Sequence, residues 1–521
     1  MDSYKIGHLI IRADSGPRIG TGHVMRCLAL AQRWQACGGR CTFLSRCESE
    51  ALRSWIESAG FDFVPLSVSH PDSSDLRKTL LLLGQLSSLN PNAPLWLILD
   101  GYYFDPAYQQ AIRTAGHRLL VIDDNAHLKH YCADVLLNQN IHAERLDYCC
   151  DPDTLLLLGT RYVLLRNEFL TRQKSQTDVP EVARKILITL GGSDPDNVTL
   201  KIVHSLLRIE QPDLQFRVVV GPASPHFESL QKSVDPANCN LRILTSVKDM
   251  PGLMAWADVT LSAGGSTCWE LAFMGVPVLS VVLAENQREI VKYLSELGVV
   301  ADLDCISQEP EQTLSRLLSL IHNQGQRSRM SRLGRALVDG RGSERVVDLL
   351  TPKDSGERDL RLRAADPSDA SLIWQWANDP IARANSFHPE TIPWEAHLDW
   401  YARKLGSNDT RIWVLEYRRV PAGQIRYDRT SSDVAQISFT VAPHYRGRGL
   451  GTKLLEMSAN MARFELPAKW IEGITFADNS ASNRAFLKAG FKQVARKKIL
   501  GKECLVFRQP CFHAHPEELS E

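Results

Sequence analysis

The chain has 521 residues, of which 44% are hydrophobic and 23% are charged, a composition typical of a globular protein with roughly two to four domains. Sixty basic residues balance sixty acidic ones, which excludes the strong overall field that draws proteins to nucleic acid or to anionic membranes. No apolar run approaches the ~18 residues of a membrane span, no secretory signal is recognisable, and the twelve cysteines show no paired CxxC spacing. We therefore expect a cytoplasmic protein without nucleic-acid or membrane partners and without a metal site.

Apolar strands alternate with amphipathic helices along the first part of the chain. HLIIRAD predicts a strand, HVMRCLALAQRWQACG predicts a helix that ends at a glycine, and RCTFLS, LWLILDGY and RLLVIDD predict further strands. The alternation restarts at KILITLGGSD and continues through QFRVVVGP, LRILTSV, DVTLSAGG and VPVLSVVL. This order is typical of doubly wound parallel sheets. We predict two Rossmann-type domains, residues 1–165 and 166–350, with a ligand cleft between them.

The pattern changes after residue 350. Residues 351–358 are polar, contain a proline and a glycine, and predict a linker. A tryptophan-rich helical stretch follows, and RIWVLEY, AGQIRYDR and AQISFTVAP then predict antiparallel strands. We expect a third, α+β domain at residues 359–510 and a tail at residues 511–521.

A glycine-rich turn, DSGPRIGTGH, connects the first predicted strand to the first helix. Ligands bind beyond the carboxyl ends of the strands in such sheets, and a helix N-terminus offers unpaired N–H groups to an anion. Gly20, Thr21 and Gly22 therefore predict a phosphate-binding loop that holds His23 over the cleft. The simpler alternative is that His23 only caps the helix.

Polar side chains end the neighbouring strands. Asp14, Asp100 and Tyr102 are candidates to orient His23 or a bound sugar, although both aspartates also fit ordinary strand-end carboxylates. Arg26, one turn into the helix, fits a structural ion-pair partner slightly better than a contact to the ligand. We keep it among the candidate ligand-binding residues.

The stretch RADSGPRIGTGHVMRCLALA resembles the amino-terminal signature of the UDP-sugar hydrolases of pseudaminic acid biosynthesis. The similarity continues in order through LDGY, IDDNAH, LLNQN, GTRYVLLRNEF and LGGSDPDN. The resemblance implies a GT-B-like fold, UDP-2,4-diacetamido-2,4,6-trideoxy-β-L-altropyranose as the substrate, and His23 as the general base. A neutral imidazole suits this role because it accepts a proton from water near neutral pH. Attack by water opposite the UDP leaving group implies inversion at the anomeric carbon, without a metal.

The segment SVKDMPGLMAWADVTLSAGGSTCWELAFMGVPVLSVVLAENQREI resembles the UDP site of GT-B enzymes, including the peptidoglycan enzyme that transfers N-acetylglucosamine. The resemblance implies that backbone between Val247 and Met250 holds the uracil, that Glu270 binds the ribose, and that Asn286 and Gln287 contact the donor. The helix start can receive the diphosphate. The candidate diphosphate-binding residues are Ala263, Gly264, Gly265, Ser266 and Thr267, with Gly192 and Ser193 on the opposite wall. The alternative is a plain loop followed by an ordinary first-turn acid.

In the third domain, VAPHYRGRGLGTKLLEM resembles the Q/R-x-x-G-x-G/A signature of the GNAT acetyltransferases, and ADNSASNRAFLKAGFKQV resembles a later helix and strand of that family. The alternative is a basic surface loop. Phe486 stands where many members carry a tyrosine that serves as general acid, and a phenyl ring cannot donate a proton. The resemblance implies an acetyl-CoA site formed by Val441, Arg446, Gly447, Arg448, Gly449, Leu450, Gly451, Thr452, Asn479, Asn483 and Phe486.

The stretches WQWANDP and HLDWYARKL resemble acetyltransferases that modify the 4-amino group of UDP-linked amino sugars in the same pathway. His397, Trp400 and Gln424 are candidates for the acceptor site, although each also fits a packing role. Together the resemblances predict a bifunctional N-acetyltransferase and UDP-sugar hydrolase that uses acetyl-CoA as co-substrate and has other enzymes of the pathway as possible partners. The alternative is a GT-B glycosyltransferase with an appended acetyltransferase or a non-catalytic acyl-CoA-binding module.

Overall fold

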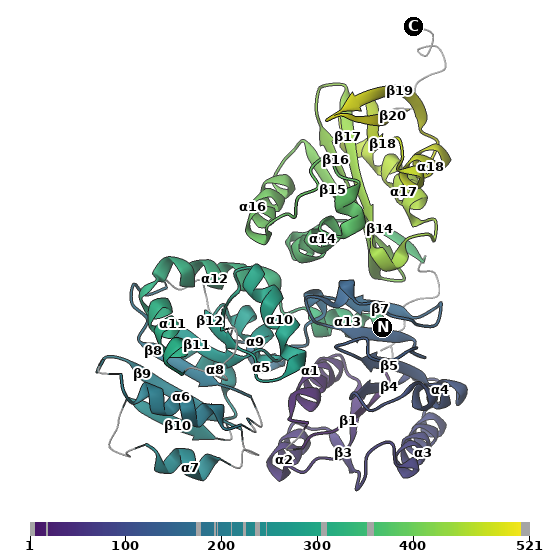
Figure 1. The fold of residues 1–521 in the computed structure, drawn as a ribbon. Coiled ribbons are helices and arrows are strands. Elements are labelled where there is room, and N and C mark those ends of the chain that lie inside the picture. The colour runs from purple at the N-terminus through teal and green to yellow at the C-terminus, as the bar shows by residue number, and fades with distance from the viewer. Residues whose placement is uncertain are drawn as a thin grey trace. The chain divides into compact units, whose positions relative to one another are not determined.

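The chain divides into two compact units, Met1–Pro352 and Lys353–Glu521. The first unit contains two parallel sheets, and the second contains one mixed sheet (Figure 1). The computed structural model describes residues 6–16, 19–172, 179–191, 194, 196–209, 211–221, 226–234, 240–245, 247–303, 310–351 and 359–511.

The first sheet is parallel and has seven strands in the order β3-β2-β1-β4-β5-β6-β7. Its strands are β1 (His8–Ala13), β2 (Arg40–Ser45), β3 (Asp62–Pro65), β4 (Leu95–Asp100), β5 (Arg118–Ile122), β6 (Val135–Asn138) and β7 (Leu155–Leu158). Its helices are α1 (Gly22–Ala36), α2 (Glu50–Ser58), α3 (Ser73–Leu89), α4 (Pro106–Thr114), and the short 3-10 helices η1 (Ala143–Arg145) and η2 (Thr160–Tyr162). The strand order reverses between β1 and β4, the point at which such sheets bind ligands.

The second sheet is also parallel, in the order β10-β9-β8-β11-β12-β13. Its strands are β8 (Lys185–Thr189), β9 (Gln215–Val220), β10 (Leu241–Thr245), β11 (Val259–Ala263), β12 (Val278–Val281) and β13 (Val300–Leu303). The accompanying helices are α5 (Asn167–Leu170), α6 (Val198–Leu206), α7 (Phe227–Lys232), α8 (Met250–Trp256), α9 (Thr267–Met274), α10 (Glu285–Glu296), α11 (Pro310–His322), α12 (Gln324–Leu337) and α13 (Gly342–Leu350).

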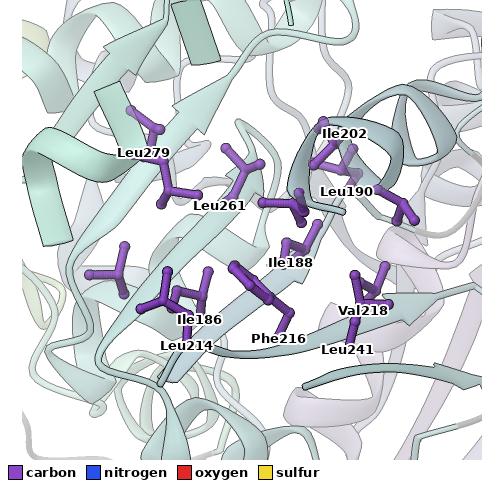
Figure 2. Close-up of a cluster of buried hydrophobic side chains, with 14 of the residues drawn as sticks. Ile186, Ile188, Leu190, Ile202, Leu214, Phe216, Val218, Leu241, Leu261 and Leu279 are labelled. Carbon is purple, nitrogen blue, oxygen red and sulfur yellow. The ribbon is translucent and has the colours of Figure 1, made fainter. Parts of the chain in front are cut away.

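The central strands of both sheets are apolar along most of their length because helices cover both faces. Every residue of β1 after His8 is buried, as is every residue of β11. Figure 2 shows Ile186, Phe216 and Leu261 of three strands in one cluster with Ile202 of α6. The predicted pair of Rossmann-type sheets is confirmed, while the boundaries between the domains stay predictions.

The last helix of the first unit joins its two halves. Helix α13 follows the second sheet in sequence but packs against α1 and η2 of the first half. Trp96 of β4 donates its indole N–H to the carbonyl of Leu350, at 3.0 Å. After the second sheet the chain therefore returns to the first half, a connection that the strand and helix pattern alone does not predict.

The sheet of the second unit is mixed, in the order β14-β15-β16-β17-β18-β20-β19. Its strands are β14 (Leu360–Ala364), β15 (Thr410–Tyr417), β16 (Val420–Arg429), β17 (Val434–Val441), β18 (Trp470–Phe476), β19 (Lys492–Ile499) and β20 (Lys502–Pro510). Its helices are α14 (Ala370–Ala377), α15 (Pro380–Ala384), α16 (Trp394–Leu405), α17 (Leu450–Glu465) and α18 (Ser480–Lys488), with 3-10 turns η3 (Pro367–Asp369) and η4 (Pro443–Tyr445). The predicted α+β class is confirmed.

Strands β17 and β18 form the one parallel pair of this sheet, and they separate part-way along. Their register ends at Ile437 and Gly473, although β17 runs on to Val441 and pairs there with β16. Helix α17 follows β17 after a short loop, so its N-terminus lies beyond the carboxyl end of a strand that has lost one neighbour. In Figure 1, α14 and α16 lie on one side of this sheet and α17 and α18 on the other.

Within the described part of the chain, no helix combines the length and the apolar character that crossing a bilayer requires.

Candidate active sites

The loop before α1 closes on itself and delivers a histidine to the start of the helix. Gly20 has a φ of +76°, a conformation that favours glycine, and its N–H donates to the carbonyl of Gly16 at 2.8 Å. Thr21 is the N-cap but makes no side-chain cap, so the first N–H groups of α1 are not satisfied by it. His23 is therefore the second residue of a helix whose N-terminus remains open to an anion.

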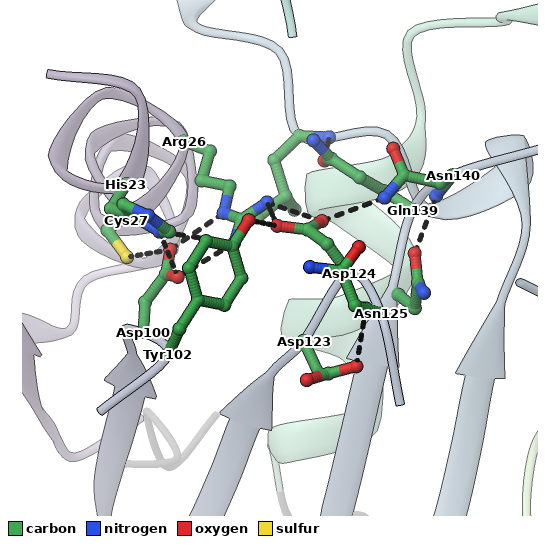
Figure 3. Close-up of polar contacts among 12 residues, drawn as sticks. His23, Arg26, Cys27, Asp100, Tyr102, Asp123, Asp124, Asn125, Gln139 and Asn140 are labelled. Atoms are coloured by element: carbon green, nitrogen blue, oxygen red, sulfur yellow. Dashed lines mark hydrogen bonds and ion pairs between the residues drawn. The ribbon is translucent and has the colours of Figure 1, made fainter. Parts of the chain in front are cut away.

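His23 is hydrogen-bonded to a buried carboxylate. Its Nδ1 lies 2.6 Å from Oδ1 of Asp100, which ends β4 and has no exposed side-chain surface, while the His23 side chain is 11% exposed. Because an ionised carboxylate only accepts, Nδ1 carries the hydrogen in this contact, and in the neutral form of the imidazole the lone pair is then on Nε2. This pair brings together two residues that the sequence predicted for one site (Figure 3).

Arg26 lies between two aspartates. Its Nε and Nη2 each donate to Asp100 at 2.7 Å, and its Nη1 donates to both oxygens of Asp124, at 2.8 and 3.0 Å. Burial alone would raise the pKa of Asp100, but Arg26 and His23 together hold that pKa well below its ordinary value. Arg26 thus makes ion pairs with both aspartates, and its contact to a ligand stays a prediction.

Asp124, which sequence reasoning missed, organises the far side of this cluster. It accepts from the hydroxyl of Tyr102 at 2.7 Å and from the side-chain amide of Asn140 at 2.8 Å. The Tyr102 ring meets the His23 ring edge-on, with centroids 5.1 Å apart. Burial raises the pKa of Tyr102, and the negative charge of Asp124 raises it further. The doublet IDD was visible in the sequence, but only the fold shows which aspartate faces the histidine.

Asp14 lies in a separate buried network. It is 2% exposed and is paired with Arg12, and it also accepts from Ser69 and Tyr103, both at 2.6 Å. Burial alone would raise the pKa of Asp14, but these partners hold that pKa below its ordinary value. Asp100, and not Asp14, makes the hydrogen bond to His23, while the contacts of Asp14 fasten the loops around the site. A role of Asp14 toward the sugar stays a prediction.

The second half supplies a glycine loop between β11 and α9. Ala263 ends the strand, Ser266 is the N-cap, and Thr267 begins the helix. Gly264 lies against α10, since a Cβ at this position would come within 2.3 Å of Val291. A Cβ on Gly22 would lie 3.8 Å from the Ser266 hydroxyl, so the loops of the two halves approach each other.

The other nucleotide-site candidates surround this loop. Glu270, in the first turn of α9, receives a hydrogen bond from Arg166 at 3.4 Å, and burial raises its pKa. Gln287 accepts from the N–H of Leu283 at 2.9 Å, while Asn286 is exposed in the first turn of α10. Val247 and Met250 flank the start of α8, and Gly192 and Ser193 lie outside the described residues.

A second contact between the halves was not anticipated. The rings of His142, next to η1, and Tyr293, on α10, are stacked with centroids 6.0 Å apart. The guanidinium of Arg145 lies over the same tyrosine, 4.5 Å from its centroid. None of these three residues belongs to a recognisable motif, so no sequence signal pointed to them.

In the second unit, the predicted acetyl-CoA loop lies between β17 and α17. Gly447 and Gly449 have φ angles of +77° and +78°, and Gly449 is the N-cap of α17. Val441 ends β17, and the loop continues through Arg448, Leu450, Gly451 and Thr452 into the helix. The two left-handed glycines turn the backbone so that the N-terminus of α17 opens at the place where β17 and β18 separate.

Arg446, the first residue of the motif, is anchored within the protein. It donates to Asp379, the N-cap of α15, at 2.6 Å and to the carbonyl of Val441 at 3.2 Å. Its guanidinium therefore ties the loop to α15.

Three further candidates make contacts within the protein. Asn479 caps α18, and the buried Asn483 bonds to Thr475 and to the carbonyls of Phe476 and Ala477. Phe486 is 1% exposed and packs against Phe439, Phe491 and Phe507. The ring of Phe486 therefore fills the core, and its expected contact with acetyl-CoA stays a prediction.

The acceptor-site candidates differ in accessibility. His397 is 1% exposed, donates from Nε2 to the carbonyl of Ala370 at 2.9 Å, and stacks on Trp394 and Tyr401. Burial lowers the pKa of His397 to about 4. His397 thus packs in the core, and its acceptor role stays a prediction that this burial does not favour. Trp400 and Gln424 stay predictions; the first is half-buried beneath Arg426, and the second lies buried on β16.

One group of possible metal ligands occurs in the described residues, although the sequence predicted none. His130, Cys132 and Asp151 bring one ligand atom each to within 4.8 Å of one another. His130 Nε2 already contacts Asp151 at 2.8 Å, which accounts for that pair as a hydrogen bond.

Two family models match the chain. Residues 186–338 match the glycosyltransferase family 28 C-terminal domain, and residues 359–492 match the acetyltransferase (GNAT) domain. The chain therefore joins a segment similar to a glycosyltransferase domain to a segment similar to an acetyltransferase domain. We call residues 6–351 the GT-B-type unit and residues 359–511 the GNAT unit.

Three curated relatives align with this chain over most of their own length. An uncharacterized protein of Methanocaldococcus jannaschii is 22% identical over 94% of this chain and 97% of its own, and so matches along both units. The UDP-2,4-diacetamido-2,4,6-trideoxy-β-L-altropyranose hydrolase of Campylobacter jejuni is 24% identical over 56% of this chain and 97% of its own. The spore coat polysaccharide biosynthesis protein SpsG of Bacillus subtilis is 27% identical over 66% of this chain and 97% of its own.

Among solved structures, a putative acetyltransferase of Salmonella typhimurium with its cofactor acetyl-CoA is 23% identical, with a TM-score of 0.28, over 30% of this chain and 98% of its own.

Proposed function

We propose that the GT-B-type unit hydrolyses UDP-2,4-diacetamido-2,4,6-trideoxy-β-L-altropyranose to UDP and the free sugar, with inversion. One observation carries the proposal: Nδ1 of His23 is 2.6 Å from the buried Asp100, so Nε2 is left as a base at an open helix N-terminus. The name of the Campylobacter jejuni relative supplies the substrate.

The reaction needs one proton transfer and one bond exchange. Nε2 of His23 takes a proton from water while the water oxygen bonds to the anomeric carbon. The bond from that carbon to the phosphate oxygen breaks, and UDP leaves with the electron pair. Asp100 stabilises the imidazolium that forms, in the way a carboxylate supports a catalytic histidine elsewhere.

The leaving group requires stabilisation of negative charge. We assign this task to the N–H groups at the start of α9, where Gly265, Ser266 and Thr267 turn the chain into the helix. Glu270 would accept from the ribose hydroxyls in place of its long contact to Arg166. The approach of Gly22 to Ser266 supports one site made by both halves.

The test is an NMR assay of the anomeric proton of this UDP-sugar with the wild type and with His23→Ala. We expect UDP and the inverted free sugar from the wild type only. UDP binding by the variant serves as the control for folding. Intact substrate with both proteins would overturn the hydrolase assignment for this sugar.

We propose further that the GNAT unit N-acetylates the 4-amino group of a UDP-linked amino sugar with acetyl-CoA. The support is the GNAT match together with the left-handed glycines that open the N-terminus of α17 beside the separating strands. Phe486 is in the core and cannot protonate the departing thiolate, so that proton must come from another group or from water. Acetyl transfer from acetyl-CoA to the 4-amino UDP-sugar, assayed with the full chain, tests this activity.

A second candidate is a UDP-sugar glycosyltransferase with an attached acetyltransferase or acyl-CoA-binding module. The match of residues 186–338 to the glycosyltransferase family 28 model favours it. Product analysis separates the two, because a glycosyltransferase retains the UDP-sugar until an acceptor is supplied, and the hydrolase releases free sugar.

A further inference from the structure

The proposed base belongs to a network of polar side chains that extends beyond Asp100. The hydrogen bonds of this network link, in order, His23, Asp100, Arg26, Asp124 and Tyr102 (Figure 3). These residues come from α1, from the end of β4 and the loop after it, and from the residues that follow β5. With His23 neutral, one arginine faces two aspartates, so the cluster carries a net charge of −1 that a proton on His23 would cancel.

We propose that Arg26 and Asp124 form a positioning pair for this base, which fixes the imidazole and balances the charge beside it. The inference rests on the proposed hydrolysis but adds two residues that need not touch the substrate. Arg26 prevents the charge near His23 from reaching −2, and Asp124 in turn neutralises part of Arg26.

The planar guanidinium of Arg26 suits this role because it contacts both carboxylates at once. Three of its nitrogens are used, two on Asp100 and one on Asp124, and Nη2 is also 3.3 Å from Nδ1 of His23. The side chain is 8% exposed, so solvent screens these contacts little. A lysine would keep the charge but could not bridge both carboxylates in a fixed plane.

Asp124 acts on the imidazole by two routes. It accepts two hydrogen bonds from Arg26, and it accepts from the hydroxyl of Tyr102, whose ring packs edge-on against His23. Asn140 holds the carboxylate from a third direction. Asp124 therefore restrains both the electrostatic partner and the aromatic wall of the base.

The pair predicts pH shifts of opposite sign. The titratable and charged groups that face His23 are Arg26 on α1, Asp100 at the end of β4, Tyr102 after it, and Asp124 after β5, while Cys27 on α1 contacts Asp100. Asp124→Asn removes a negative charge, which makes protonation of the cluster harder. Arg26→Gln removes a positive charge, which makes protonation easier.

The experiment measures kcat/KM for UDP release against pH with the wild type, Asp124→Asn, Arg26→Gln and Arg26→Lys. We expect the acidic limb to move to lower pH in Asp124→Asn and to higher pH in Arg26→Gln, each by about one pH unit. Arg26→Lys should leave the limb near its wild-type position and lower kcat/KM roughly 10- to 100-fold, because charge is kept and geometry is lost. Arg113→Gln, which breaks the Arg113–Asp134 ion pair of the same half, is the matched control and should leave the profile unchanged.

A substrate-free readout separates this inference from the proposed function. With isotope-labelled histidine, the His23 resonance of the full chain is assigned by its absence in His23→Ala, and its titration is followed in each variant. Opposite shifts in Asp124→Asn and Arg26→Gln support the pair even if no sugar nucleotide is hydrolysed. Unshifted titration in Asp124→Asn, an isosteric change that removes the charge and keeps one of the two oxygen acceptors, overturns it, as do shifts of the same sign in both variants.

Discussion

At the scale of single residues, the proposed catalytic base depends on one buried partner. His23 and Asp100 are 77 positions apart in the chain, yet their side chains meet at 2.6 Å. Sequence reasoning named both residues, and it named Asp14 beside them with equal weight. Both carboxylates are buried, so the partners of each one distinguish them.

The Asp100→Asn variant tests this partnership. An amide can donate to Nδ1 and so favours the wrong tautomer, with the hydrogen on Nε2, where water must be deprotonated. We expect hydrolysis to fall roughly 10²- to 10⁴-fold while UDP affinity stays within about twofold of the wild type. Steady-state hydrolysis and calorimetric UDP titration measure the two quantities. Equal loss of binding and turnover would show instead that Asp100 only maintains the fold.

A buried histidine gives the GNAT unit a pH-dependent stability. Burial lowers the pKa of His397 from 6.5 to about 4, so the folded state stays neutral where the unfolded chain takes up a proton. The contribution of His397 to folding is complete above about pH 6.5 and is lost as the pH falls toward 4, by up to about 3 kcal/mol.

The measurement is hydrogen exchange of peptides from α16 in the full chain between pH 7 and pH 4, corrected for intrinsic exchange. We expect protection to fall steeply below pH 6.5 in the wild type. His397→Gln, which removes the titrating group, should flatten this dependence although it lowers stability at pH 7. The same slope in both proteins would contradict the assignment.

At the scale of elements, both candidate sites are built in the same way: a strand ends, glycines turn the chain, and a helix presents its N-terminus. The loops before α1, α9 and α17 each follow this plan. The sequence located all three loops, because glycine clusters between an apolar strand and an amphipathic helix are visible in one dimension. It did not show that Arg446 would be fastened to α15 or that Phe486 would fill the core, since these contacts involve distant elements.

Two adjacent glycines allow a matched test of the loop before α9. A Cβ on Gly264 would come within 2.3 Å of Val291, whereas one on Gly265 would meet nothing within 4 Å. We expect Gly264→Ala to push the loop from α10, to destabilise the protein by about 1–3 kcal/mol and to weaken UDP binding. Gly265→Ala should leave stability nearly unchanged. Chemical denaturation and UDP titration measure both effects, and equal stability of the two variants would count against the packing described for Gly264.

At the scale of the whole molecule, the chain joins two units that each carry their own candidate site. The proposed chemistries use different residues and different ligands, so single substitutions should separate them. His23→Ala should abolish sugar-nucleotide hydrolysis and leave acetyl transfer intact. Gly449→Val, which places a branched side chain at a φ of +78°, should raise the KM for acetyl-CoA and leave hydrolysis intact. Assays of both activities on both variants decide this, and loss of both activities in either variant would contradict it.

Chelation tests the expectation that the hydrolysis needs no metal ion. The proposed site neutralises the diphosphate with helix N–H groups, so we expect hydrolysis to continue after dialysis against EDTA. A loss of activity that added zinc or magnesium restores would refute this and would direct attention to His130, Cys132 and Asp151.

The sequence by itself determined the two parallel sheets, the mixed third sheet, the three glycine loops and the position of His23. These follow from local periodicity and from residues close together in the chain, which is why they can be read in one dimension. Only the tertiary structure decided that Asp100 and not Asp14 supports the histidine, that Arg26 bridges to Asp124, and that His397 and Phe486 are core residues. A carboxylate or ring takes its role from burial and from partners on other elements, and those partners are chosen when the strands and helices pack together.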